Sequence, residues 1–163
     1  MNLTSSDRKQ LIEEINKRGI TVIPDIVPES LISKLNRFVK LNIKDKDYRH
    51  LAGSTAGHLN FSFGDNYIDE IKEEIIDIIM PIAKDYLNSK TVTVSIGCNV
   101  NMPNSVYQHW HTDSDFNDNW LVANCLLEDF TDNNGPTNYV VGTHKKYISY
   151  IGYLLRFDSL IFF

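Results

Sequence analysis

Residues 108–113 (QHWHTD) place two imidazoles and one carboxylate within six positions. Short apolar runs lie on both sides of this stretch, and residues 133–136 (NNGP) are a strong turn signal. Apolar runs of this length, bounded by turn residues, are typical of strands. We therefore predict strands at 91–96, 106–111, 120–127 and 139–141.

The first half of the chain has helical patterns instead, with apolar residues recurring at a spacing of three and four. We predict helices that run from 4–7 to Gly19, from 28–30 onward, and over 67–86. Pro81 should break or kink the third helix. Two short strands are predicted at 19–24 and 59–63. Helices gathered on one side of an antiparallel sheet indicate an α+β fold with a jelly-roll architecture.

The size and composition predict one domain. The chain has 163 residues, and 42% of them are apolar, which is enough for a sizeable core. We expect a single domain that is helical over 1–87 and a jelly roll over 88–163. The sequence ends in the apolar run 157–163 (FDSLIFF), which resembles a core strand, so we expect the jelly roll to be incomplete.

Charge and targeting signals narrow the possible partners. The net charge is −5 and no stretch is rich in Lys or Arg, which argues against nucleic-acid and anionic-membrane partners. No apolar run approaches the ~18 residues of a membrane span, and the N-terminus lacks the apolar segment of a signal peptide. Cys98 and Cys125 have no metal-type spacing and indicate a reducing compartment, although they can also form one disulfide. We expect a cytoplasmic protein.

The stretch 108–113 predicts a metal site. On a strand, His109, His111 and Asp113 point to one face. The Cα atoms of residues 109 and 113 are then ~13 Å apart, too far for one ion with bonds of ~2 Å. A pair two residues apart is separated by only ~6.6 Å and can converge. We predict that His111 and Asp113 bind a metal ion, as two thirds of a 2-His-1-carboxylate triad, with His109 as a rim or core residue; a His-x-Asp triplet is also common by chance.

Residues 133–145 (NNGPTNYVVGTHK) follow this motif by about twenty positions. The two pieces together resemble the phytanoyl-CoA dioxygenase-like family, whose members carry a His-x-Asp motif, an apolar strand, an Asn-Gly hairpin and a Pro-Gly-(Ser/Thr)-His-Lys turn. Here Val141 stands where the family usually has Pro. Residues 19–24 (GITVIP) are similar to the family's N-terminal segment, so the likeness runs from about residue 17 to the end.

The resemblance implies a dioxygenase that uses Fe(II), 2-oxoglutarate and O2 to hydroxylate a small organic substrate. Asp113 implies hydroxylation, because related halogenases have a small residue at the carboxylate position. The family's third ligand is a distal His, followed by an Arg, and both come after a strand that 157–163 resembles. We therefore expect that the chain stops before them and has little activity. His144 and Arg156 are poor substitutes, and His144 resembles a turn residue of the family.

Further polar and aromatic residues are candidates for the pocket. By the resemblance, 2-oxoglutarate contacts are expected from Asn99, Asn101 and Asn124. Each of these can instead make an inter-strand hydrogen bond or support a turn. Substrate-pocket candidates are Trp110, Trp120 and His58, for which a core or structural role is the alternative.

Two other functions remain open. One is a non-catalytic jelly-roll module that has lost its metal triad and binds a small ligand or partner. The other is a different cupin-like metalloenzyme in which His109 or His144 is a ligand.

Overall fold

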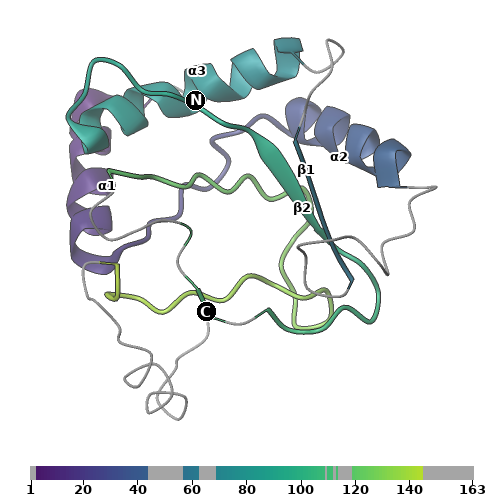
Figure 1. Cartoon of the computed structure of the whole chain (residues 1–163). Coiled ribbons are helices and arrows are strands. Elements are labelled where there is room, and N and C mark those ends of the chain that lie inside the picture. The colour runs from purple at the N-terminus through teal and green to yellow at the C-terminus, as the bar shows by residue number, and fades with distance from the viewer. Residues whose placement is uncertain are drawn as a thin grey trace.

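The computed structural model describes residues 3–43, 57–62, 69–108, 110–111, 113 and 119–144. Within them the elements are α1 (Ser5–Arg18), α2 (Glu29–Ile43), β1 (His58–Ser62), α3 (Asp69–Leu87) and β2 (Gly97–Asn101). Figure 1 shows the three helices as a frame around two sides of the molecule, with the strands and the extended segments between and below them. All three predicted helices are confirmed.

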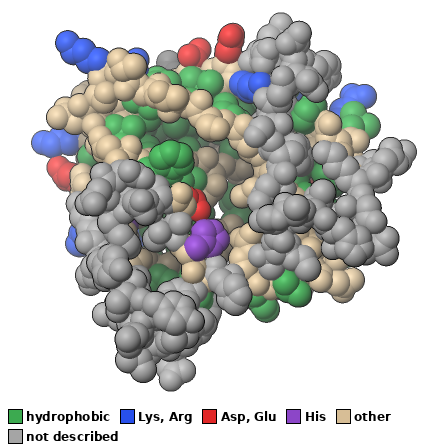
Figure 2. Space-filling view, viewed as in Figure 1, with side chains coloured by type: hydrophobic (Ala, Val, Ile, Leu, Met, Phe, Trp, Pro, Cys, Tyr) green, Lys and Arg blue, Asp and Glu red, His purple; other side chains and the backbone are tan. Residues whose placement is uncertain are grey.

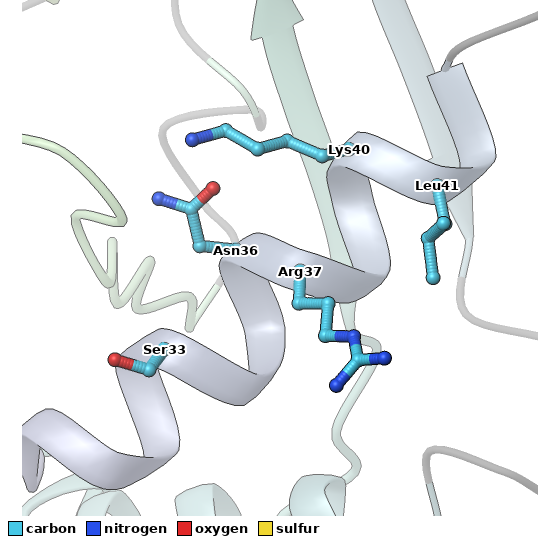
Figure 3. A pocket seen from close by; sticks show the side chains of 5 residues that line it. All are labelled: Ser33, Asn36, Arg37, Lys40 and Leu41. Carbon is cyan, nitrogen blue, oxygen red and sulfur yellow. The ribbon is translucent and has the colours of Figure 1, made fainter.

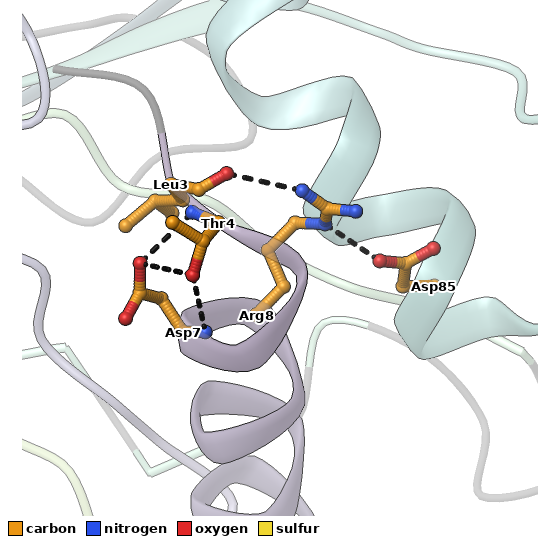
Figure 4. Close-up of polar contacts among 5 residues, drawn as sticks. All are labelled: Leu3, Thr4, Asp7, Arg8 and Asp85. Atoms are coloured by element: carbon orange, nitrogen blue, oxygen red, sulfur yellow. Dashed lines mark hydrogen bonds and ion pairs between the residues drawn. The ribbon is translucent and has the colours of Figure 1, made fainter.

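The ends of α1 follow from local chemistry. Thr4 and Asp7 form a capping box, in which the Asp7 N–H donates to Thr4 Oγ1 at 3.2 Å and the Thr4 N–H donates to Asp7 Oδ2 at 2.8 Å. Gly19 ends the helix with φ +82°, a conformation that favours glycine, and its N–H donates to the Ile15 carbonyl at 2.7 Å. Arg8 then joins α1 to α3 through Asp85, with Nε and Oδ2 2.7 Å apart (Figure 4).

The core lies where α2 and α3 meet the second half of the chain. Leu31 and Leu35 of α2 are buried against Ile71 of α3. Cys125 and Leu127 are half-buried against this cluster, so the segment 119–127 packs on the helices. The apolar stripe that predicted α2 therefore faces the core as expected.

Pro81 does not break α3. The helix runs from Asp69 to Leu87 with Pro81 inside it. Proline removes one backbone donor, here toward the Asp77 carbonyl. Both residues are exposed, so water can satisfy that carbonyl and the helix continues.

The strand predictions were mostly wrong. β1 confirms the strand at 59–63 to within one residue at each end, and it pairs antiparallel with β2, with His58 opposite Asn101 and Ser62 opposite Gly97. The second strand begins at 97, just after the predicted strand 91–96. Among the described residues, the following predicted segments are not strands: 19–24, 91–96, 106–111, 120–127 and 139–141. A strand needs a ladder partner as well as an apolar pattern, and within the described residues these segments have no such partner. The jelly roll therefore remains a proposal.

Among the described residues, the segment after β2 is held by side-chain hydrogen bonds and single backbone hydrogen bonds in place of a ladder. The Asn101 amide donates to the Gly135 carbonyl at 2.6 Å, which ties β2 to the predicted Asn-Gly turn. Further on, the Gly142 N–H donates to the Arg18 carbonyl at 2.6 Å, and His144 Nε2 lies 3.3 Å from the Asn16 carbonyl. Residues 142–144 thus dock on the C-terminal end of α1. None of the helices described here is long and apolar enough to cross a membrane.

Candidate metal centre

His111 and Asp113 converge on each other. Nε2 of His111 lies 3.4 Å from Oδ1 of Asp113, and the side chains are 57% and 56% exposed. Two ligand atoms that each lie about 2.1 Å from one ion are about 3.0 Å apart at a right angle and about 3.4 Å apart at a tetrahedral angle. The nitrogen and oxygen donors therefore fit two neighbouring positions around one divalent ion. The same contact is an ion pair when the imidazole is protonated.

Among the described residues, the pair His111 and Asp113 has no third candidate ligand beside it. Within these ranges no three His, Cys, Asp or Glu side chains are grouped so as to hold a metal ion. His144 instead contacts the α1 carbonyl of Asn16. His109 lies outside the described residues, as does Arg156. The arrangement is thus a half-exposed imidazole–carboxylate pair.

Neither cysteine is suited to nucleophilic or thiolate chemistry. Cys98 and Cys125 are free and half-buried. Burial raises the pKa of the Cys98 thiol to about 11, and it also raises the pKa of Cys125. Both thiols are protonated at neutral pH, and the thiolate is the reactive form.

Asn124 and Tyr139 form a polar pair. Nδ2 of Asn124 donates to the hydroxyl of Tyr139 at 2.6 Å. Burial raises the pKa of Tyr139, the Asn124 hydrogen bond lowers it, and the negative charge of Asp113 raises it. Tyr139 was not a candidate in the sequence, because only its pairing with Asn124 singles it out.

The other predicted residues fall into different environments. The Asn101 amide donates a hydrogen bond to the Gly135 carbonyl, which is the turn-supporting alternative given above for this residue. Asn99 is exposed on the same face of β2. His58 is only 8% exposed, and its Nε2 lies 2.7 Å from the Val106 carbonyl, which favours a structural role. Trp110 is half-buried and Trp120 is 54% exposed.

A hollow lies on α2, and none of the residues that line it is a site candidate from the sequence. It has a volume of 380 Å³ and is lined by Ser33, Asn36, Arg37, Lys40 and Leu41. Figure 3 shows these side chains fanning out from a single helix rather than converging. Lys40 and Asn36 contact Glu128 and the Leu127 carbonyl at 3.0 Å each, so they hold α2 to the segment 119–127. We do not regard this hollow as an active site.

The charged side chains are unevenly distributed over one face of the molecule. Figure 2 shows a histidine and an acidic side chain side by side near the centre of one face, whereas the Lys and Arg side chains lie mostly at its edge. The centre of this face therefore presents an imidazole and a carboxylate to solvent.

Most of the chain matches a known protein family. Residues 15–153 match the family described as phytanoyl-CoA dioxygenase (PhyH). The matched range runs from the last turn of α1 through all later helices and strands, and it includes the pair His111 and Asp113 and the turn 142–144. No curated protein and no solved structure matches the chain.

Proposed function

Because the chain belongs to the phytanoyl-CoA dioxygenase family, whose members are in general Fe(II)- and 2-oxoglutarate-dependent oxygenases of a cupin-like fold, we propose that it hydroxylates a small organic substrate with Fe(II), 2-oxoglutarate and O2. The observation that carries the proposal is the 3.4 Å approach of His111 Nε2 to Asp113 Oδ1 inside the matched range. The substrate itself is left open.

The chain's residues have distinct tasks in this proposal. His111 supplies a neutral imidazole nitrogen and Asp113 an anionic oxygen, on neighbouring positions of the ion. When bound, Fe(II) and 2-oxoglutarate supply the oxidising power, with succinate and CO2 as co-products. Asp113 also fills a coordination position that a halide would need, which favours hydroxylation over halogenation. Asn99, Asn101 and Asn124 are the amides proposed to contact the co-substrate. Asn101 and Asn124 would do so with the amide atoms that remain after Asn101 donates to the Gly135 carbonyl and Asn124 donates to the Tyr139 hydroxyl.

An anaerobic titration tests the proposal. We expect that Fe(II) and 2-oxoglutarate, added together at concentrations high enough to saturate a weak two-ligand site, give the weak charge-transfer absorbance of the ternary complex. His111→Ala and Asp113→Ala should abolish this band, because each removes one of two ligands. His144→Ala is the control and should keep it, since His144 contacts α1. Absence of the band from the unmodified chain would contradict the proposal and leave the pair as a surface ion pair.

A further inference from the structure

The first residue of β1 is bonded to the segment that follows β2. His58 is only 8% exposed, and its Nε2 lies 2.7 Å from the Val106 carbonyl. A carbonyl oxygen can only accept a hydrogen bond, so Nε2 carries a proton and donates it. The buried imidazole therefore fixes the position of the Val106 carbonyl.

Gly57 adds two contacts to the turn that lies just before Val106. Its carbonyl accepts from the Met102 N–H at 2.9 Å, and the Ser105 N–H donates to the Met102 carbonyl at 3.0 Å, which closes the turn 102–105. Gly57 has φ +87°, and a Cβ on it would lie 2.5 Å from Cα of Ser105. The turn therefore packs directly on the backbone of Gly57.

These contacts set the place where the chain leaves the two-stranded sheet. β2 ends opposite His58 in the antiparallel register. The chain then passes through the turn 102–105 to Val106, which precedes His111 by five residues. Between Val106 and His111 the described positions belong to no helix or strand. The hydrogen bond from His58 therefore defines the point from which the chain runs to the candidate metal centre.

We infer that His58 is a positioning residue for this centre: its Nε2–H holds the Val106 carbonyl and thereby places His111 where it converges with Asp113. The inference rests on the proposed function, because the pair is a metal site only if that proposal holds. Residues that orient a metal ligand without touching the ion typically change the metal affinity by about 10–100-fold. His58 acts through a stretch of chain, so we expect the lower end of this range.

The test uses Co(II) in place of Fe(II), because Co(II) is stable in air and its visible spectrum reports the ligand geometry. We expect His58→Leu in the full chain to weaken Co(II) binding by about 10-fold in calorimetry and to alter the spectrum of the saturated complex, because Leu cannot donate to the Val106 carbonyl. A purely structural role would lower the melting temperature and leave that spectrum unchanged, which would overturn the inference.

His58→Gln distinguishes positioning from direct metal binding. The Gln side-chain nitrogen is as many bonds from the backbone as Nε2 of His58, and it can donate to the same carbonyl. We expect His58→Gln to restore both the affinity and the spectrum of the unmodified chain. A Gln variant that behaves like His58→Leu would contradict the inference, because the imidazole itself would then be required.

Gly57→Ala tests the same turn without changing the imidazole. Its Cβ would clash with the Ser105 backbone and displace the turn, so Co(II) binding should weaken and the spectrum should change. Gly142→Ala is the matched control and should change neither. Its φ of +81° gives a similar backbone cost, and no atom lies within 4 Å of the added Cβ.

The outcomes separate the inference from the proposed function. If the unmodified chain binds Co(II) and the folded variants His58→Leu and Gly57→Ala bind it equally well, the inference fails while the proposed function stands. If His58→Leu does not fold, Gly57→Ala alone decides. If the unmodified chain does not bind Co(II), both the inference and the proposed function fail.

Discussion

The negative charge of Asp113 acts on a half-buried phenol, and at the scale of single residues this coupling can be measured. Burial and Asp113 both raise the pKa of Tyr139, and the Asn124 amide lowers it. Asp113→Asn removes one of the two raising causes, so we expect the pKa of Tyr139 to fall. Ring-carbon NMR of labelled tyrosine over a pH series measures this, with the resonance identified by its loss in Tyr139→Phe.

The control for this titration is Glu128→Gln. Glu128 is paired with Lys40 and is not among the groups that shift the pKa of Tyr139. Its neutralisation should leave that pKa unchanged. An unchanged pKa in Asp113→Asn as well would mean that the two groups are not coupled.

Single residues also show what the sequence could predict about the site. The approach of His111 to Asp113 was expected, because two residues at i and i+2 are brought together by local geometry. Whether they bind a metal stays a prediction. Tyr139 was missed, because its partner is 15 residues away and only the pairing of two distant segments brings them together. Asn101 stays a predicted co-substrate contact, and the hydrogen bond from its amide to the Gly135 carbonyl was one that the sequence could not specify, because the two residues are 34 positions apart.

At the scale of elements, the start of α1 depends on a small cap. Thr4→Ala removes the hydroxyl that accepts from the Asp7 N–H, and we expect a loss of about 1 kcal/mol. For a chain of this size that lowers the melting temperature by about 2–4 °C. Thr93→Ala, at an exposed threonine outside the helices, is the control and should have little effect.

The cap also has a predicted pH dependence. The hydrogen bonds from the Thr4 side chain and backbone lower the pKa of Asp7. A carboxyl whose pKa is lower in the folded state stabilises the fold above its ordinary pKa, and this contribution is lost as the pH falls through the lowered value. The difference in melting temperature between the unmodified chain and Asp7→Asn should therefore shrink from pH 7 to about pH 2.5. A difference independent of pH would contradict this account.

The elements differ in how far the sequence predicts them, for a physical reason. A helix is made of contacts three and four residues apart, so Thr4, Gly19 and the stripe of Leu31 and Leu35 were sufficient signals. A strand needs a partner at any distance. The run 91–96 alternates as a strand does, yet the ladder forms at Gly97–Asn101, where β1 is available. Pattern alone does not specify which segment finds the partner.

At the scale of the whole molecule, the contact between α1 and the turn 142–144 joins two distant parts of the chain. A Cβ on Gly19 would lie 2.5 Å from Nδ1 and 2.9 Å from Cβ of His144. Gly19→Ala therefore adds a clash to the cost of a left-handed backbone, which alone is about 1–2 kcal/mol. We expect a larger loss of unfolding free energy than this backbone cost.

Gly142→Ala separates the two effects, because Gly142 has nearly the same φ of +81° and no atom within 4 Å of an added Cβ. Gly142→Ala should reduce the free energy of unfolding only by the cost of the left-handed backbone. The clash should disappear when His144→Ala is combined with Gly19→Ala. Measured by denaturant unfolding, Gly19→Ala should then cost no more unfolding free energy than Gly142→Ala does. Equal losses for both glycine variants would show that His144 does not press on Gly19. This contact was beyond sequence reasoning, which described His144 only as a turn residue.

The hydrogen bond from Gly142 to the Arg18 carbonyl has a consequence for how the protein is made, since 124 residues separate the two. A ribosome adds about 5–20 residues per second, so about 6–25 s pass between the synthesis of α1 and that of its docking turn. During this interval the C-terminal end of α1 has no native partner from that turn. A chaperone that binds nascent chains would find this end of the helix open until translation has passed residue 142.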